Sequence, residues 1–221
     1  MDVVGNFKEI RKTIPAYVTL VAVSKFHPSE SILQLYKETG HLIYGESRAQ
    51  EFASKFSLLP SDLKWHFIGH LQTNKVKMVI PGVSMIQSVD SYKLLKEINR
   101  HSLSLQKVTE VLLQFHIATE ESKFGFSLQE AMDMLHDRDF EDMSNVKVRG
   151  VMGMATFTSD TRIVGREFKT LRSFFEDIKR EYYTKEQSFN EVSMGMSDDY
   201  LLAIQEGSTM VRIGSSIFGS R

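Results

Sequence analysis

One lysine in this sequence is placed where an amine can do covalent chemistry. Lys25 follows the apolar run Val21-Ala22-Val23, which has the unalternating character of a parallel strand covered on both faces, and Pro28 helps to end the run. The carboxyl ends of parallel strands form the edge at which α/β proteins hold ligands. Lys25 is therefore a candidate for Schiff-base formation with a carbonyl compound, unless it is simply a strand-end lysine that extends into water.

Two short segments near the end of the chain suit an anion. Residues 193–197 read Ser-Met-Gly-Met-Ser and residues 214–216 read Gly-Ser-Ser, so both are small and rich in backbone N–H groups. We expect Ser197 to begin a helix, whose amino end also favours negative charge. In barrels, phosphate sites frequently follow the seventh and eighth strands, and both segments fall at those places. Their joint position predicts a phosphate site.

An arginine between these segments is expected to point inward. Period-two alternation in residues 210–214 places Val211 and Ile213 on one face of a strand and Arg212 on the other. In a barrel, this alternation favours aliphatic side chains toward the surrounding helices and the guanidinium toward the interior. Arg212 then either forms a structural ion pair with a carboxylate such as Glu46 or donates to a bound ligand.

Short apolar runs alternate with amphipathic stretches along the whole chain, which is the pattern of repeated βα units. We expect a leading helix near residues 4–14 and strands at 17–25, 42–45, 65–69, 83–87, 108–117, 146–154, 189–194 and 209–213. Ser127 and Glu130 have the spacing of a capping box. Eight units predict an α/β fold, a single (β/α)8 TIM barrel over residues 1–221 with an extra N-terminal helix. An open doubly wound sheet is the competing architecture.

The composition excludes several classes of function. The formal net charge is −1, so no global basic field favours nucleic acid or an anionic membrane. The chain has no cysteine, which removes disulfides, thiolate catalysis and cysteine-based zinc sites, and no cluster of His, Asp and Glu has metal-site spacing. The first fifteen residues are charged and lack a long apolar run, so we expect neither a signal peptide nor a membrane span, and a cytoplasmic location.

Six motifs resemble those of the pyridoxal phosphate homeostasis proteins, the YggS/PROSC family, which is similar to the barrel domain of alanine racemase. They are AVSK at 22–25, GESRAQE at 45–51, WHFIG at 65–69, LQTNK at 71–75, SMGMSDD at 193–199 and GSTMVRIG at 207–214. They occur in the family order and span nearly the whole chain. Many members have asparagine where this chain has Ser47, and proline where it has His70.

The resemblance implies one monomeric (β/α)8 barrel of the fold-type III class, with pyridoxal 5′-phosphate (PLP) held on Lys25 as an internal aldimine. It implies that Arg212 faces the pyridine nitrogen, and that the phosphate is contacted by Ser193, Met194, Gly195, Gly214 and Ser215. Ser47 and Met154 also lie at strand ends, so we include them among the cofactor contacts. We include His66 as well, although its place within an apolar strand is typical of a hydrogen-bonded core histidine.

Three functions remain open from the sequence. A guanidinium does not give up its proton, so Arg212 would leave the ring nitrogen unprotonated and the cofactor a weaker electron sink. Racemisation also needs acid and base groups on both faces of the substrate, and in alanine racemases one comes from a second domain of a partner subunit. We therefore expect a non-enzymatic protein of intracellular PLP homeostasis that buffers PLP or delivers it to apo PLP-dependent enzymes. The alternatives are a stand-alone fold-type III racemase or lyase and a cofactor-free Schiff-base aldolase.

Overall fold

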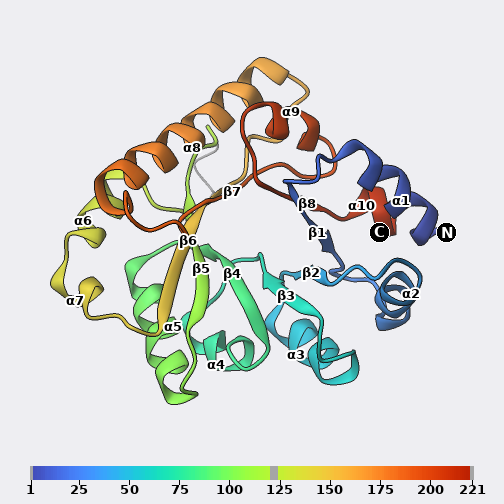
Figure 1. The fold of residues 1–221 in the computed structure, drawn as a ribbon, viewed down its shortest axis with the longest axis horizontal. Helices are drawn as coiled ribbons and strands as arrows, with labels where there is room; N and C mark the ends of the chain where they lie inside the picture. The colour runs from blue at the N-terminus through green and yellow to red at the C-terminus, as the bar shows by residue number, and fades with distance from the viewer. Residues whose placement is uncertain (1, 120–123, 220–221) are drawn as a thin grey trace.

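Eight parallel strands close into a barrel in the computed structural model, which describes residues 2–119 and 124–219 (Figure 1). The strands are β1 (Thr19–Val23), β2 (Ile43–Glu46), β3 (Lys64–Phe67), β4 (Val83–Val89), β5 (Thr109–Phe115), β6 (Val146–Gly153), β7 (Glu191–Ser193) and β8 (Met210–Ile213). Pairing of β1 with β8, in register from Thr19 opposite Met210 to Ala22 opposite Ile213, closes the sheet. The predicted barrel is confirmed, and the open doubly wound sheet is wrong.

Helices surround the barrel on the outside (Figure 1). They are α1 (Val3–Thr13), α2 (Ser29–Thr39), α3 (Ala49–Leu58), α4 (Val76–Val79), α5 (Tyr92–Ser104), α6 (Leu128–Leu135), α7 (Arg138–Glu141), α8 (Thr161–Tyr182), α9 (Tyr200–Gln205) and α10 (Ser215–Phe218), with a 3-10 turn η1 (Thr73–Lys75) before α4. The leading helix and the Ser127–Glu130 capping box are confirmed. The predicted helix start at Ser197 is wrong, because α9 begins three residues later with Asp199 at its N-cap position.

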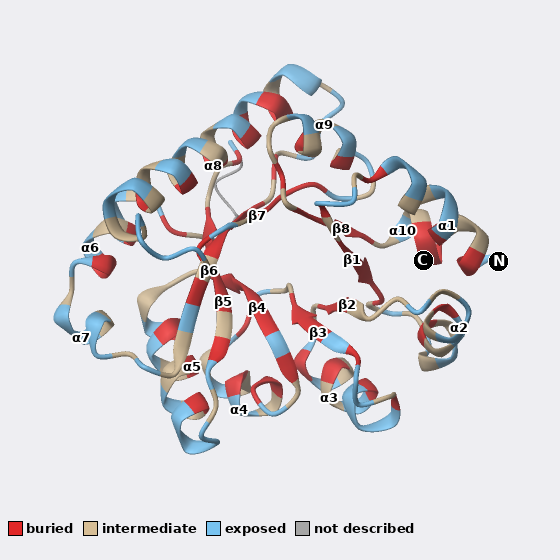
Figure 2. Ribbon diagram, viewed as in Figure 1, coloured by how far each residue is buried: buried red, intermediate tan, exposed pale blue. Residues whose placement is uncertain are grey.

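Two layers of apolar side chains hold the barrel together. The larger layer lies between the strands and the helices, where the longer helices bury only their inward stripe (Figure 2). The smaller layer is rich in methionine and fills the barrel interior; it consists of Val21, Met85, Leu112, Met152 and Met210. Val211 and Ile213 belong to the outer layer, which confirms the alternation predicted for β8. None of the helices in the described ranges is long and apolar enough to cross a membrane.

Candidate functional site

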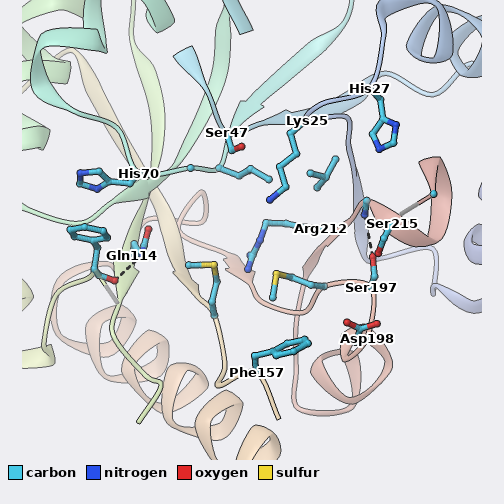
Figure 3. Close-up of a pocket in the computed structure, with 18 residues that line it drawn as sticks. Lys25, His27, Ser47, His70, Gln114, Phe157, Ser197, Asp198, Arg212 and Ser215 are labelled. Atoms are coloured by element: carbon cyan, nitrogen blue, oxygen red, sulfur yellow. Dashed lines mark hydrogen bonds between the residues drawn. The ribbon is translucent and has the colours of Figure 1, made fainter. Parts of the chain in front are cut away.

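A cavity of about 630 Å³ lies at the carboxyl ends of the strands. Lys25, from the turn after β1, and Arg212, from β8, both project into its middle (Figure 3). Ser197, Ser215 and His27 lie on one side of this pair, whereas His70 and Gln114 lie on the opposite side. The closed barrel thus brings together side chains from both ends of the sequence, because β1 and β8 are neighbours.

A four-residue turn, not the strand itself, carries Lys25. The strand β1 ends at Val23, and the backbone N–H of His27 donates to the carbonyl of Ser24 at 3.0 Å. Lys25 and Phe26 are the two central residues, and Phe26 has a φ of 68°. A positive φ at the third residue is the geometry of a type II turn, where glycine is the usual residue. The prediction that Lys25 ends the strand is therefore corrected by two residues.

Arg212 is buried, with 4% of its surface exposed, and its guanidinium is held by two acceptors. One terminal nitrogen donates to Ser193 Oγ at 2.6 Å and the other donates to the Gly153 carbonyl at 3.0 Å. Burial lowers the pKa of Arg212 to about 10, so the group remains charged at neutral pH. A guanidinium has five N–H donors, and these two bonds leave further donors for the cavity that Arg212 lines.

The alternative of a structural Arg212–Glu46 ion pair is wrong. Glu46 Oε1 instead accepts hydrogen bonds from the Lys55 ammonium and from the Ser24 hydroxyl, each at 2.7 Å. Glu46 lies at the end of β2, where the barrel register places it beside the turn after β1. Glu46 Oε1 is thus occupied on the outer side of the barrel, and the Arg212 guanidinium is held by neutral oxygens.

A buried chain of hydrogen bonds runs from Arg212 through the barrel interior. The Ser193 hydroxyl donates to Gln87 Oε1 at 2.6 Å, and Gln87 Nε2 lies 2.8 Å from His66 Nδ1. Because an amide nitrogen only donates, His66 Nδ1 is the acceptor, and the neutral ring carries its proton on Nε2. Burial lowers the pKa of His66 to about 4, in agreement with a neutral ring. Ser193 therefore orients Arg212 directly, and His66 does so through Gln87. Neither residue is among those that line the cavity, and their contact with a ligand stays a prediction.

The buried His66 predicts a loss of stability in acid. Its pKa falls from 6.5 to about 4 on folding, so between these values the unfolded chain binds a proton that the folded chain does not. The free energy of unfolding should therefore decrease as the pH is lowered from about 6.5 to 4, by about 3 kcal/mol from this group. Denaturant unfolding across this range should show a shallower decrease in His66→Gln, which retains an acceptor for Gln87. An identical pH profile in the variant would contradict a neutral, buried His66.

The loop between β7 and α9 forms one wall of the cavity. Gly195 has a φ of 95°, and a Cβ there would lie 2.6 Å from Ala203 Cβ, so this turn requires glycine. The Met194 N–H donates to the Met210 carbonyl, and the wall is formed by the residues that follow, Met196, Ser197 and Asp198. Met194 and Gly195 are not among the residues that line the cavity, and their contact with a phosphate stays a prediction.

Six of the predicted site residues line the cavity together, namely Lys25, Ser47, Met154, Arg212, Gly214 and Ser215. Their contact with a cofactor stays a prediction. Residues that the sequence did not indicate also line it, namely His27, Gln114, Phe124, Phe157 and Asp198. Of these, only Gln114 could have been identified from the local sequence, because it is a polar residue within an apolar strand. Its side-chain amide donates to the Phe124 carbonyl at 2.8 Å. Phe124 in turn stacks on His70 with ring centroids 4.1 Å apart.

The donors around the cavity fit a phosphorylated aromatic aldehyde. Lys25 supplies an amine and Arg212 supplies unused N–H donors, while Ser197 and Ser215 place hydroxyl groups on one side. Apolar walls from Met154 and Phe157 suit a flat ring. Among the described residues that line the cavity, the Asp198 carboxylate is the one acidic group, and it opposes an anion. Within the described ranges, no group of three or more His, Asp or Glu side chains could hold a metal ion.

The chain is similar in sequence and in fold to several known proteins. The family model for the alanine racemase N-terminal domain matches residues 3–221. The pyridoxal phosphate homeostasis protein of Aquifex aeolicus is 39% identical over 203 residues, which are 91% of this chain and 86% of that protein. The protein of the same name from Schizosaccharomyces pombe is 37% identical over 207 residues, covering 92% and 84%. The structure of PipY from Synechococcus elongatus with PLP bound superposes with a TM-score of 0.88 and 30% identity, covering 98% of this chain and 100% of that one.

Proposed function

Because the chain belongs to the alanine racemase N-terminal domain family and, within it, to the pyridoxal phosphate homeostasis proteins, we propose that it binds PLP and maintains its intracellular supply. The observation that carries this proposal is the position of Lys25 and Arg212 in the middle of one cavity at the carboxyl end of the barrel. A carrier needs an amine to hold the aldehyde, donors for the phosphate and a wall for the ring, and the described residues provide all three.

Each part of the cavity has a defined task in this proposal. Lys25 would hold the cofactor through its amine, which can condense with an aldehyde with loss of water. Arg212 would donate to the ring from a position fixed by Ser193 and Gly153. Ser197, Gly214 and Ser215 receive the phosphate on the side of the cavity where they gather. When bound, the cofactor supplies an aldehyde that condenses with amines and a ring that withdraws electrons.

The role is binding rather than turnover. The curated relatives are homeostasis proteins, and a racemase or lyase is not favoured. Arg212 supports this view because a guanidinium cannot accept or release a proton at neutral pH, so it can orient a ring but cannot act as a catalytic base. As finer parts of the proposal, we suggest that the protein works as a cytoplasmic monomer and that apo PLP-dependent enzymes receive the cofactor.

Cofactor transfer tests the proposal directly. We expect the PLP-loaded protein to restore activity to an apo aminotransferase even when a phosphatase destroys all free PLP, because the cavity protects the bound cofactor. An equal amount of free PLP treated with the same phosphatase is the control and should restore nothing. Racemisation of L-alanine by the loaded protein should not exceed that of free PLP. Fast stereospecific racemisation, or complete loss of the cofactor to the phosphatase, would overturn the carrier function.

A further inference from the structure

We propose that three charged side chains outside the cavity, Glu46, Lys55 and Glu51, position Lys25 by holding the residues on both sides of it. This inference rests on the proposed function, in which Lys25 is the amine that holds the cofactor. The three residues are called the α3 charge cluster below, because Glu51 and Lys55 belong to α3 and Glu46 ends β2. They act through the turn that carries Lys25 and are positioning residues.

Lys55 is the centre of the α3 charge cluster. Its side chain is buried, and its ammonium group donates to the Ser24 carbonyl at 2.8 Å and to Glu46 Oε1 and Glu51 Oε1 at 2.7 Å each. A lysine ammonium has three N–H donors, so these three acceptors account for all of them. The position of the Lys55 ammonium is therefore fully specified, and it is joined directly to the residue before Lys25.

The two carboxylates reach the Lys25 turn from both ends. Glu46 Oε1 accepts from the Ser24 hydroxyl at 2.7 Å, and Glu51 Oε1 accepts from the backbone N–H of Phe26 at 2.6 Å. Lys25 is the one residue between these two anchored neighbours. Glu51 and Lys55 are four residues apart and therefore share one face of α3. One face of α3, together with the end of β2, thus determines where the Lys25 side chain leaves the backbone.

The turn requires such support because its conformation is unfavourable. Phe26 is not glycine but has a φ of 68°, and a residue in this region costs on the order of 1–3 kcal/mol. Phe26 is 40% exposed, so burial of its ring compensates only partly. The Arg48 guanidinium lies 4.3 Å from the centre of the Phe26 ring and adds a third contact from the start of α3. Without these contacts the turn would relax and Lys25 would leave its place in the cavity.

A purely stabilising role explains the cluster less well. Burying charged groups carries a desolvation cost that can exceed the attraction between them, so buried ion pairs add little net stability. Here Glu46 Oε2 is buried without a hydrogen-bond partner among the described residues, and burial raises the pKa of Glu46. A well-packed neutral pair would avoid both costs. The cluster is therefore better explained by the geometry that it imposes on Ser24 and Phe26.

Neutral replacement of the buried pair tests this inference. In Glu46→Gln/Lys55→Met the shape is nearly kept and the net charge is unchanged, but the Ser24 carbonyl loses its donor. We expect the dissociation constant for PLP, measured by equilibrium dialysis, to rise about tenfold or more. The midpoint of thermal unfolding of the cofactor-free protein should fall no further than it does in the control Lys107→Met, because both changes leave a backbone carbonyl without its donor. Lys107→Met is the matched control. Like Lys55, Lys107 holds backbone through its ammonium group, which donates to the carbonyls of Ile80 and Val83, but Lys107 is not among the residues that line the cavity.

Two further variants address the turn itself. Glu51→Leu removes the acceptor for the Phe26 N–H at a partly exposed position, so it should weaken PLP binding even if the double variant does not fold. Phe26→Gly removes the backbone strain at residue 26. When Glu51→Leu is added to Phe26→Gly, it should therefore weaken PLP binding less than it does in the wild type. Wild-type affinity in both Glu51→Leu and the double variant would overturn the inference. A wild-type protein that takes up no PLP on Lys25 would instead overturn the proposed function.

Discussion

Lys25→Ala is expected to abolish covalent retention of PLP. After incubation with PLP and reduction with borohydride, the wild type should gain the mass of one cofactor on the peptide that contains Lys25, and the variant should gain none there. The reason is geometric. Among the described residues that line the cavity, Lys25 is the only lysine and Arg212 is the only arginine, and a guanidinium does not form a stable Schiff base.

A neighbouring lysine provides the control for this experiment. Lys75 lines a neighbouring hollow beside α3 and is not among the residues that line the cavity, so Lys75→Ala should be labelled like the wild type. Peptide mapping is essential, because exposed lysines react slowly with any aldehyde. Stoichiometric labelling of a different lysine in both the wild type and Lys25→Ala would show that the covalent site has been misassigned.

Arg212→Glu is expected to have the second-largest effect. It should weaken PLP binding but leave the Lys25 amine available for the covalent link. The substitution replaces a buried donor with a buried carboxylate, next to Asp199, whose charge already acts on this position. Loss of a charged hydrogen bond together with repulsion should raise the dissociation constant for PLP about 100-fold or more. Ser193 and Gly153 also lose their donor, so the cofactor-free protein should be less stable by about 3–5 kcal/mol.

Arg149→Glu is the matched control, which separates the loss of PLP affinity from the loss of stability. Arg149 is another strand arginine that donates to a backbone carbonyl, that of Ser188 at 2.8 Å, but it also binds Glu110 and does not line the cavity among the described residues. Arg149→Glu should therefore lower stability and leave the PLP affinity of the folded protein unchanged. Affinities are compared by titration at a temperature where each variant is folded. If Arg212→Glu binds PLP as tightly as Arg149→Glu does, Arg212 is not a cofactor contact.

The alternation of hydrophobic residues determined the architecture. Eight apolar runs separated by amphipathic stretches predicted the eight strands, and the structure confirms them with ends shifted by a few residues. Capping at Ser127 was equally local, because the hydroxyl bonds to an N–H only three residues away. The inward direction of Arg212 followed from period-two alternation together with the predicted barrel. The family motifs then located the ligand end of the barrel, because they mark successive strand ends along the chain.

The partners of the buried polar groups were decided only by the tertiary structure. The Ser193 hydroxyl bridges Arg212 and Gln87, a residue 106 positions away from Ser193, and nothing in the local sequence indicated this bridge. Glu46 was an alternative partner for Arg212, but β2 presents it to Lys55 instead. A side chain's face follows from local periodicity, whereas its hydrogen-bond partner depends on the register and closure of strands that are distant in sequence. The sequence therefore determined the barrel and the candidate amine Lys25, and the closed barrel decided which groups hold that amine in place.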